Sequence, residues 1–167
     1  MFGLFGSLLG GLKLSLGGHK VALGNSKSNK IEGGHKSDLL FGGKGDDAIY
    51  GNGGNDKLVG GKGSDYLDGG SGNDTLIGAA GDDYLIGGSG KDTFVFGRND
   101  GNDTIADFEI GRDMVDVRAY REYDSLDDLN PIQDTDGSVL LQLNPYNSIR
   151  LMDTDLNKLS DGDFWFA

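Results

Sequence analysis

The chain has 167 residues, with 31 glycines, two prolines and no cysteine, and its formal net charge is −12. This length suits one domain of ordinary size or two very small ones. The acidic balance argues against nucleic acid as a partner, because a phosphate backbone attracts basic surfaces. The absence of cysteine excludes disulfides, thiolate zinc sites and cysteine nucleophiles, so something else must brace the fold.

Residues 1–23 open with an apolar stretch that glycines interrupt. Its large apolar residues are spaced 3-4-3-4, as on one face of an amphipathic helix: Phe2, Phe5, Leu9, Leu12 and Leu16. The stretch is shorter than the ~20 apolar residues of a spanning helix. It also lacks the basic start and small-residue cleavage site of a Sec signal peptide. We expect no transmembrane segment, and a helical N-terminal cap over residues 1–23, with a membrane-surface segment as the alternative.

From Gly33 the sequence repeats every nine residues. Seven blocks, from GGHKSDLLF to GGSGKDTFV, follow one another, and a weaker block, GNSKSNKIE, precedes them. Position 6 of all seven blocks is an aspartate: Asp38, Asp47, Asp56, Asp65, Asp74, Asp83 and Asp92. Position 8 is always apolar: Leu40, Ile49, Leu58, Leu67, Leu76, Leu85 and Phe94. One apolar residue per block cannot bury a core, so the blocks must stack.

The residue types predict a turn and then a short strand in each block. Glycines at positions 1, 2 and 4 allow positive φ and aim carbonyl oxygens into the turn. The following triplet forms a strand whose middle side chain points to one face. Two blocks then make one coil of a flattened parallel helix, in which like turns recur every 18 residues. We therefore predict an all-β fold with a parallel β-roll over residues 24–104.

This arrangement sorts the aspartates into two rows. The first row holds Asp38, Asp56, Asp74 and Asp92, and the second row holds Asp47, Asp65 and Asp83. Neighbours in a row lie one strand spacing apart, roughly 4.7–4.9 Å, and repel unless a cation lies between them. Calcium fits better than magnesium, because it accepts 6–8 oxygen ligands in flexible geometry. We expect the chain to stay unfolded without cations, as a flexible glycine-rich linker would be.

The blocks resemble the calcium-binding nonapeptide GGxGxDxUx of the repeats-in-toxin (RTX) family, where U is apolar. Blocks from Gly42, Gly60, Gly69 and Gly87 match at every specified position, and Lys36, Asn52 and Ala79 depart from the pattern. The resemblance implies a right-handed β-roll that binds about five to six calcium ions between successive turns. It implies five sandwiched pairs: Asp38/Asp56, Asp56/Asp74, Asp74/Asp92, Asp47/Asp65 and Asp65/Asp83. It implies carbonyl ligands from Gly43, Gly45, Gly54, Gly61, Gly63, Gly70, Gly72, Gly81, Gly88 and Gly90.

Residues 105–167 leave the nine-residue period. Asp103, in the shifted segment Gly101–Ile105, is expected to close a last site opposite Asp83. The later segments resemble the antiparallel region that follows RTX repeats in type I secreted proteins: Ile105–Phe108, Gly111–Val117 and Asp163–Phe166. The resemblance implies a C-terminal β cap and secretion signal over residues 105–167, an ABC-type export channel as partner, and an extracellular location. A closing strand that buries Phe164 and Phe166 explains the same residues, and both interpretations can hold.

The sequence shows no catalytic constellation. His19 and His35 have no nearby nucleophile, and neither an H-E-x-x-H nor a G-x-S-x-G motif occurs. We therefore expect no enzyme activity.

Two ladders of large side chains face away from the predicted core. One sheet carries Phe41, Val59, Ile77 and Val95 at position 9, for which we expect cover by residues 1–16 or by the tail. The other sheet carries Tyr66 and Tyr84 at position 7, with Tyr50 nearby. With Lys44, Lys57 and Lys62 beside it, this face is a candidate site for an acidic polysaccharide, as in the similar modules of alginate epimerases. The alternatives are a scaffold that self-assembles with calcium, and a module of a larger secreted enzyme.

Overall fold

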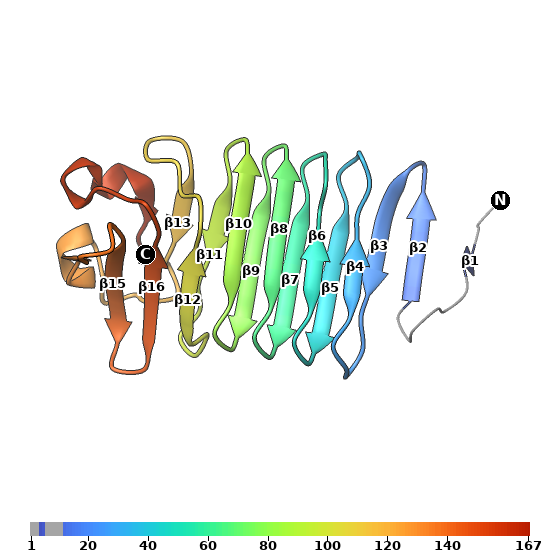
Figure 1. Ribbon diagram of the computed structural model, residues 1–167, viewed down its shortest axis with the longest axis horizontal. Coiled ribbons are helices and arrows are strands. Elements are labelled where there is room, and N and C mark those ends of the chain that lie inside the picture. Colours follow the sequence, from blue (N-terminus) through green and yellow to red (C-terminus); the bar gives the residue numbers. More distant parts are fainter. Residues whose placement is uncertain (1–3, 6–11) are drawn as a thin grey trace.

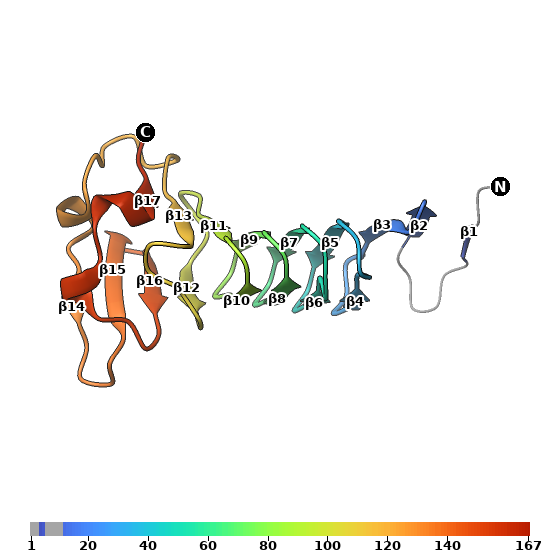
Figure 2. The ribbon, with the colours of Figure 1, turned by 90° about the horizontal axis from the view of Figure 1, so that it is seen from above.

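The computed structural model describes residues 4–5 and 12–167, which form two long sheets that face each other (Figures 1 and 2). The nine-stranded sheet has the order β1-β2-β3-β5-β7-β9-β11-β13-β17, and the eight-stranded sheet has the order β14-β15-β16-β12-β10-β8-β6-β4. From β3 to β13, successive strands alternate between the sheets. The chain is therefore an all-β parallel roll, as predicted.

Short strands build the roll and its ends. The roll consists of β3 (His19–Leu23), β4 (Lys30–Glu32), β5 (Leu39–Lys44), β6 (Ala48–Tyr50), β7 (Lys57–Lys62), β8 (Tyr66–Ser71), β9 (Thr75–Ala80), β10 (Tyr84–Ser89), β11 (Thr93–Val95), β12 (Asn102–Ile105) and β13 (Met114–Asp116). The other strands are β1 (Leu4–Phe5), β2 (Leu12–Leu16), β14 (Ile132–Gln133), β15 (Val139–Asn144), β16 (Asn147–Leu151) and β17 (Phe164–Trp165). The helices are single 3₁₀ turns, η1 (Leu126–Leu129), η2 (Leu156–Lys158) and η3 (Asp161–Asp163).

The position-8 side chains form the core between the sheets. Strands 18 residues apart pair in register, with Leu40 opposite Leu58 and Leu58 opposite Leu76. Every position-8 side chain from Leu40 to Phe94 is fully buried. Each position-8 residue therefore buries its apolar surface mainly against the position-8 residues of adjacent coils. Each strand thus contributes a single side chain to the core.

Stacking of the coils needs glycine where turns approach one another. A Cβ on Gly60 would lie 2.2 Å from Oδ2 of Asp65 and 2.7 Å from the carbonyl oxygen of Gly78. Gly63 has φ +119°, and a Cβ there would lie 2.5 Å from the carbonyl oxygen of Gly45. Any larger residue at either position would push adjacent turns apart.

The predicted N-terminal helix is wrong for the described part of residues 1–23. Leu12–Leu16 and His19–Leu23 form an antiparallel hairpin, and β3 pairs in parallel with β5. Leu12-Lys13-Leu14-Ser15-Leu16 alternates apolar and polar residues, which is the period of a strand. Phe2 and Leu9, two positions of the helical spacing, lie outside the described residues.

The expected cover over the Phe41 ladder is also wrong for the strands that the structure describes. The β2–β3 hairpin extends one edge of the nine-stranded sheet, and β17 pairs with β13 at the opposite edge. Both elements lie in the plane of the sheet instead of across its outer face.

The C-terminal region closes the other end of the roll (Figure 2). Strands β14, β15 and β16 are antiparallel to one another, but β16 joins β12 in parallel and β17 joins β13 in parallel. Phe164 is 4% exposed and Phe166 is half-buried against the core, as a closing strand requires. Within the described residues, no helix is long and apolar enough to cross a membrane.

Candidate metal centre

Backbone hydrogen bonds link the aspartates within each row. In the first row, the N–H of Asp38 donates to Oδ1 of Asp56, and the N–H of Asp56 donates to Oδ1 of Asp74, both at 2.7 Å. The second row shows the same bond from Asp65 to Asp83 at 2.7 Å, and from Asp83 to Asp103 at 3.0 Å. The structure thus brings together the aspartates predicted to pair, and Asp103 opposite Asp83.

The other carboxylate oxygen of most of these residues has no hydrogen-bond donor. These buried, unpartnered atoms are the Oδ2 oxygens of Asp47, Asp56, Asp65, Asp74, Asp83 and Asp92. A buried carboxylate oxygen without a partner carries a large desolvation penalty. Each of these oxygens is therefore a ready ligand for a cation.

Burial raises the pKa of most of the aspartate carboxyls in the two rows. It raises the pKa of Asp74 and of Asp83 to about 7, and the pKa of Asp103 to about 8. For each of these groups the charge of the preceding aspartate in its row acts in the same direction. A divalent cation between the carboxylates would remove both causes, since it neutralises the charges and replaces the lost water.

The predicted carbonyl ligands lie in turns of one shape. Ten glycines have positive φ, as the prediction requires: Gly43, Gly45, Gly54, Gly61, Gly63, Gly70, Gly72, Gly81, Gly88 and Gly90. Asn52 and Ala79, which depart from the nonapeptide, adopt φ of 71° and 73° and keep the same turn. The carbonyl oxygen of Gly54 would lie nearer to a Cβ on Gly72 than its carbonyl carbon does, which shows that this carbonyl points toward the next turn of the row.

The first turn differs from the others. Gly34 and Lys36 do not adopt positive φ. Oδ2 of Asp38 accepts the N–H of Gly34 at 2.6 Å, and Oδ1 accepts the N–H of Lys20 at 2.5 Å. Both carboxylate oxygens of Asp38 therefore already have backbone N–H donors, and Asp38 itself offers a cation no unpartnered oxygen.

Three residues at the ends of the rows escaped the sequence prediction. Lys20 lies opposite Asp38, because Val21 pairs with Leu39, and its Nζ donates to the carbonyl oxygen of Gly33 at 2.6 Å. Asn29 donates its N–H to Oδ1 of Asp47 at 2.7 Å. Asp113 lies beyond Asp92 at the other end. Counting back 18 residues from the first aspartates would have found Lys20 and Asn29, and the segment Asp113–Val115 repeats the aspartate-x-apolar pattern.

The residues present fit a hard cation with oxygen ligands. Among residues 4–5 and 12–167, no three histidine or acidic side chains converge as a metal-binding group. A cation would therefore take carboxylate oxygens from two aspartates of a row and complete its shell with glycine carbonyls. All-oxygen ligand sets with irregular geometry favour calcium.

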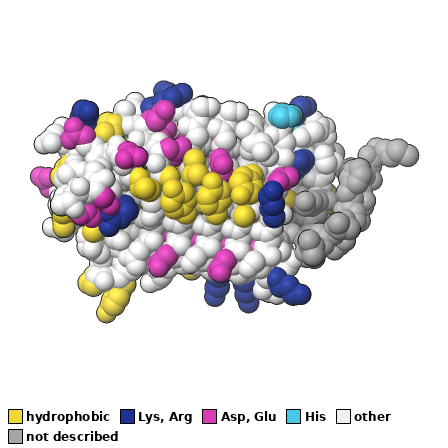
Figure 3. Space-filling model, viewed as in Figure 1, with side chains coloured by type: hydrophobic (Ala, Val, Ile, Leu, Met, Phe, Trp, Pro, Cys, Tyr) yellow, Lys and Arg dark blue, Asp and Glu magenta, His cyan; other side chains and the backbone are white. Residues whose placement is uncertain are grey.

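The tyrosines stack on the outer face of the eight-stranded sheet. The ring centroids of Tyr66 and Tyr84 are 5.8 Å apart with an interplanar angle of 8°, and those of Tyr50 and Tyr66 are 5.6 Å apart. Figure 3 shows hydrophobic side chains in a row across this face, with charged side chains at its margins. Nζ of Lys30 lies 5.2 Å from the ring centroid of Tyr50.

The lysines expected beside the tyrosines lie elsewhere. Lys44 and Lys62 end β5 and β7, and Lys57 begins β7, so all three belong to the nine-stranded sheet. The expectation that they flank the tyrosine face is wrong. The alternation of strands between two sheets explains this, because residues close in sequence fall on opposite faces of the roll.

The sequence pattern described as the RTX calcium-binding nonapeptide repeat (4 copies) matches residues 23–58, 32–67 and 59–94. These are RTX calcium-binding nonapeptide repeats. No curated protein matches the chain by sequence. The RTX roll resembles the AlgE6R2 subunit of the Azotobacter vinelandii mannuronan C5-epimerase, with 25% identity and a TM-score of 0.57 over 87% of this chain and 91% of that one.

Two further solved structures share lower similarity with this chain. The AlgE6R3 subunit of the same epimerase is 24% identical, with a TM-score of 0.48 over 85% of this chain and 80% of that one. The extracellular lipase LipA of Serratia marcescens is 18% identical, with a TM-score of 0.49 over 86% of this chain. This chain spans 39% of the lipase.

Proposed function

We propose that this protein is a secreted RTX module that folds when about five to six calcium ions bind its aspartate rows outside the cell. The supporting observation is the set of six buried Oδ2 atoms without donors. A folded chain without cations would keep these carboxylates desolvated and close to one another. Calcium binding and folding are therefore coupled.

Circular dichroism in EDTA, followed by addition of millimolar calcium, tests the coupling. The expected change is from coil to strand, with magnesium at the same concentration producing a much smaller change. Equilibrium dialysis of the folded protein should give about five to six ions per chain. A well-folded protein in EDTA at physiological salt would overturn the proposal.

Export in an unfolded state follows from the same coupling. Sub-micromolar cytosolic calcium would leave the chain unfolded, as a narrow type I channel requires, and calcium outside would fold it after passage. Deleting Asp163–Ala167 should leave the protein in the producing cell. Phe164→Ala, which weakens packing of β17 and keeps the rest of the segment, is the matched control and should be exported. Equal export of the deletion and the wild type would contradict the route.

The role outside the cell is that of a binding or scaffold module, not an enzyme. Nδ1 of His19 contacts a backbone carbonyl oxygen, that of Ser37, at 2.6 Å, and the acidic residues of the turns serve the proposed calcium rows. On the nine-stranded sheet, Leu23, Phe41 and Val59 lie in register on the outer face, and Leu23 is 40% exposed. This ladder favours self-assembly as the scaffold mechanism.

An acidic polysaccharide is the second candidate partner, and the stacked tyrosines favour it. Tyr66 and Tyr84 offer adjacent ring faces to a sugar chain, and Lys30 and Arg150 are basic residues of strands in the same sheet. The resemblance to a mannuronan epimerase subunit supports an alginate-like ligand.

Binding of alginate to immobilised, calcium-loaded protein tests this candidate. Tyr66→Ala/Tyr84→Ala should reduce binding at least tenfold. Tyr146→Ala should leave binding unchanged, because Tyr146 is 83% exposed in the C-terminal hairpin, away from the ladder. Calcium-dependent sedimentation as an oligomer, without alginate binding, would favour the scaffold. Activity that appears only after fusion to another domain would favour a module of a larger secreted enzyme.

A further inference from the structure

The first row of aspartates continues past the nonapeptide repeats. Strand β13 pairs in parallel with β11, with Thr93 opposite Met114, which places Asp113 opposite Asp92. The N–H of Asp92 donates to Oδ1 of Asp113 at 3.0 Å, as the N–H of Asp74 donates to Oδ1 of Asp92 at 2.8 Å. Asp113 follows Asp92 by 21 residues instead of 18, and lies outside the segment that matches the family pattern.

Asp92 carries an unpartnered carboxylate oxygen in the last repeat turn of the row. Its side chain is 1% exposed, and its Oδ2 has no hydrogen-bond donor. Asp113 is 3% exposed, and its Oδ2 accepts the N–H of Glu109 at 2.9 Å, which fixes the orientation of its carboxylate. Arg112, the basic residue of this turn, pairs with Glu109 and leaves Oδ2 of Asp92 without a donor. Two buried carboxylates thus lie in adjacent turns, and one of them carries an oxygen without a hydrogen-bond donor.

The last repeat turn also offers backbone carbonyl oxygens to a cation. The carbonyl of Gly70 comes within 2.0 Å of a Cβ placed on Gly88, so carbonyls at position 2 point to the following turn. The carbonyl of Gly72 comes within 1.7 Å of a Cβ placed on Gly90 and shows the same for position 4. Gly88 and Gly90 also have positive φ. By the geometry of the repeat, their carbonyls point toward the next turn, residues 106–113.

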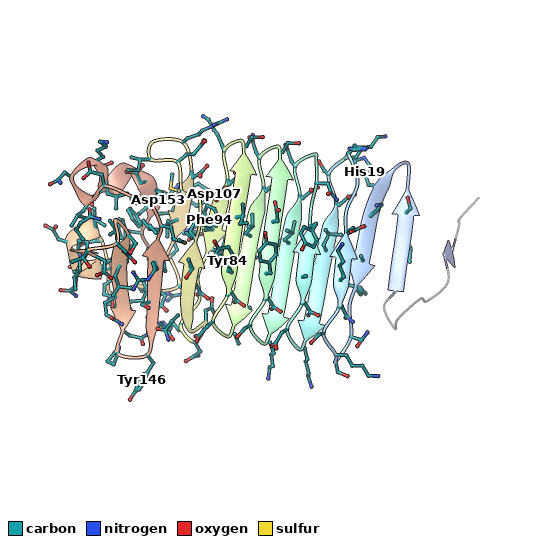
Figure 4. The ribbon with its side chains drawn as sticks, viewed as in Figure 1. His19, Tyr84, Phe94, Asp107, Tyr146 and Asp153 are labelled. Atoms are coloured by element: carbon teal, nitrogen blue, oxygen red, sulfur yellow. The ribbon has the colours of Figure 1, made fainter. Side chains whose placement is uncertain are left out.

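Asp107 docks this irregular turn onto the roll. Its Oδ1 accepts the N–H of Gly87 at 2.9 Å, and its Oδ2 accepts the N–H of Gly88 at 2.7 Å. In an ordinary coil the corresponding glycine N–H donates to a backbone carbonyl, as Gly51 does to Asp68 at 2.7 Å. The carboxylate of Asp107 therefore accepts the hydrogen bond that a backbone carbonyl of the next coil accepts elsewhere in the roll. Figure 4 shows it where the roll meets the C-terminal region, near Phe94.

We propose that Asp92 and Asp113, with the carbonyl oxygens of Gly88 and Gly90, bind one further calcium ion that closes the first row. The inference rests on the proposed binding of calcium between paired aspartates. It adds a site that no nonapeptide encodes. The ion would join the last repeat turn to residues 106–113, so calcium would also order the start of the C-terminal region.

Calcium stoichiometry of the full chain tests the site, by equilibrium dialysis at saturating calcium. Asp113→Asn should bind one ion fewer than the wild type. Asp116→Asn is the matched control, because Asp116 is a buried aspartate three residues further whose carboxylate already pairs with Arg118 at 2.7 Å. It should bind as many ions as the wild type. Asp65→Asn, in the middle of the second row, tests the proposed pairing itself and should also lose calcium.

The outcomes separate the two ideas. If Asp65→Asn loses calcium and Asp113→Asn does not, the pairing holds and the closing site is wrong. If neither loses calcium, both are wrong. Anomalous scattering from crystals of the calcium-loaded wild type avoids any folding defect of the variants. A peak between Asp92 and Asp113 is expected, and its absence at saturating calcium would overturn the site even if Asp113→Asn had lost an ion.

Discussion

At the scale of single residues, the two carboxylate oxygens of each aspartate have different partners. Oδ1 accepts a backbone N–H from the preceding turn and sets the spacing of the row, whereas Oδ2 stays free of donors in six residues. In the proposed calcium sites, one side chain would therefore serve both the packing of the turns and the binding of the cation. Substituting one aspartate would therefore affect packing and cation binding together. The size of the combined effect should differ between positions along a row.

Asp65 and Asp38 should respond differently to substitution. Asp65 lies between Asp47 and Asp83, and its Oδ2 is unpartnered, while both oxygens of Asp38 already accept N–H groups. Asp65→Ala should lose up to two bound ions, and Asp38→Ala at most one. Calorimetric titration with calcium measures both numbers. Equal stoichiometry and equal melting temperatures for the two variants would show that the two-row arrangement is wrong.

Ala79 adopts a backbone conformation that suits glycine. Its φ of 73° is in the left-handed region, which costs a residue with a Cβ roughly 1 kcal/mol. Ala79→Gly should therefore raise the stability of the calcium-loaded protein by up to about 0.5 kcal/mol, because the entropy that glycine loses on folding, roughly 0.5–1 kcal/mol, offsets much of the relieved strain. Ala80→Gly, one residue further in β9 and without positive φ, should lower stability instead. Urea unfolding in saturating calcium measures both changes.

Residue types in a strict repeat made most of the candidate site predictable. A nine-residue period fixes which aspartates stack, because register in a parallel roll follows from counting. Lys20 and Asp113 were missed because a lysine replaces the aspartate in one case, and the interval is 21 residues in the other. Neither the bond from the N–H of Lys20 to Asp38 nor the bond from the N–H of Asp92 to Asp113 can be predicted from composition.

At the scale of elements, hairpin β2–β3 shows the limit of periodicity. Leucine-rich segments with glycine satisfy both a helical spacing and a two-residue alternation, and the neighbouring strand decides between them. Here the exposed edge of β5 offers unpaired backbone groups, and β3 pairs with it. The irregular C-terminal region has no repeat to count, so the parallel pairing of β16 with β12 was not predictable.

Strand β3 places a positively charged side chain, that of Lys20, at the end of the first row. Nζ of Lys20 donates to the carbonyl of Gly33 at 2.6 Å, in the turn where Asp38 has no free oxygen. Lys20→Met should lower the stability of the calcium-loaded protein by about 1–2 kcal/mol, since a charged donor to a half-buried carbonyl is lost. The stoichiometry of calcium should not change.

Lys36→Met is the matched control for Lys20→Met. Nζ of Lys36 donates to the carbonyl of Gly17 at 2.7 Å, but this contact is exposed, so the loss should stay below about 0.5 kcal/mol. Urea unfolding in saturating calcium compares the two variants. Equal losses would mean that the Lys20 contact has no special role at the end of the row.

At the scale of the whole molecule, the proposed coupling of folding to calcium predicts that the roll is stable only when its charges are compensated. The chain carries a formal net charge of −12, and the aspartate rows concentrate part of it in two buried lines. The five to six calcium ions that we propose would supply ten to twelve positive charges and nearly cancel it, which would remove the repulsion that opposes compaction. Protons are the other cations that can occupy these carboxylates, so pH should act on the calcium-free protein.

In EDTA, strand content should rise as the pH is lowered from 8 to 5. Burial raises the folded-state pKa of Asp56 to about 6, of Asp74 to about 7 and of Asp103 to about 8, against about 3.9 in an unfolded chain. The folded state therefore binds more protons, and its stability falls as the pH rises through these values. The strand content of the calcium-loaded protein should not change between pH 6 and 8, because calcium already compensates the same carboxylates.

Asp83→Asn, which imitates a protonated side chain, should raise strand content in EDTA at pH 8, as measured by circular dichroism. A calcium-free protein whose strand content is flat or falls from pH 8 to 5 would contradict buried carboxylate charge as the barrier to folding.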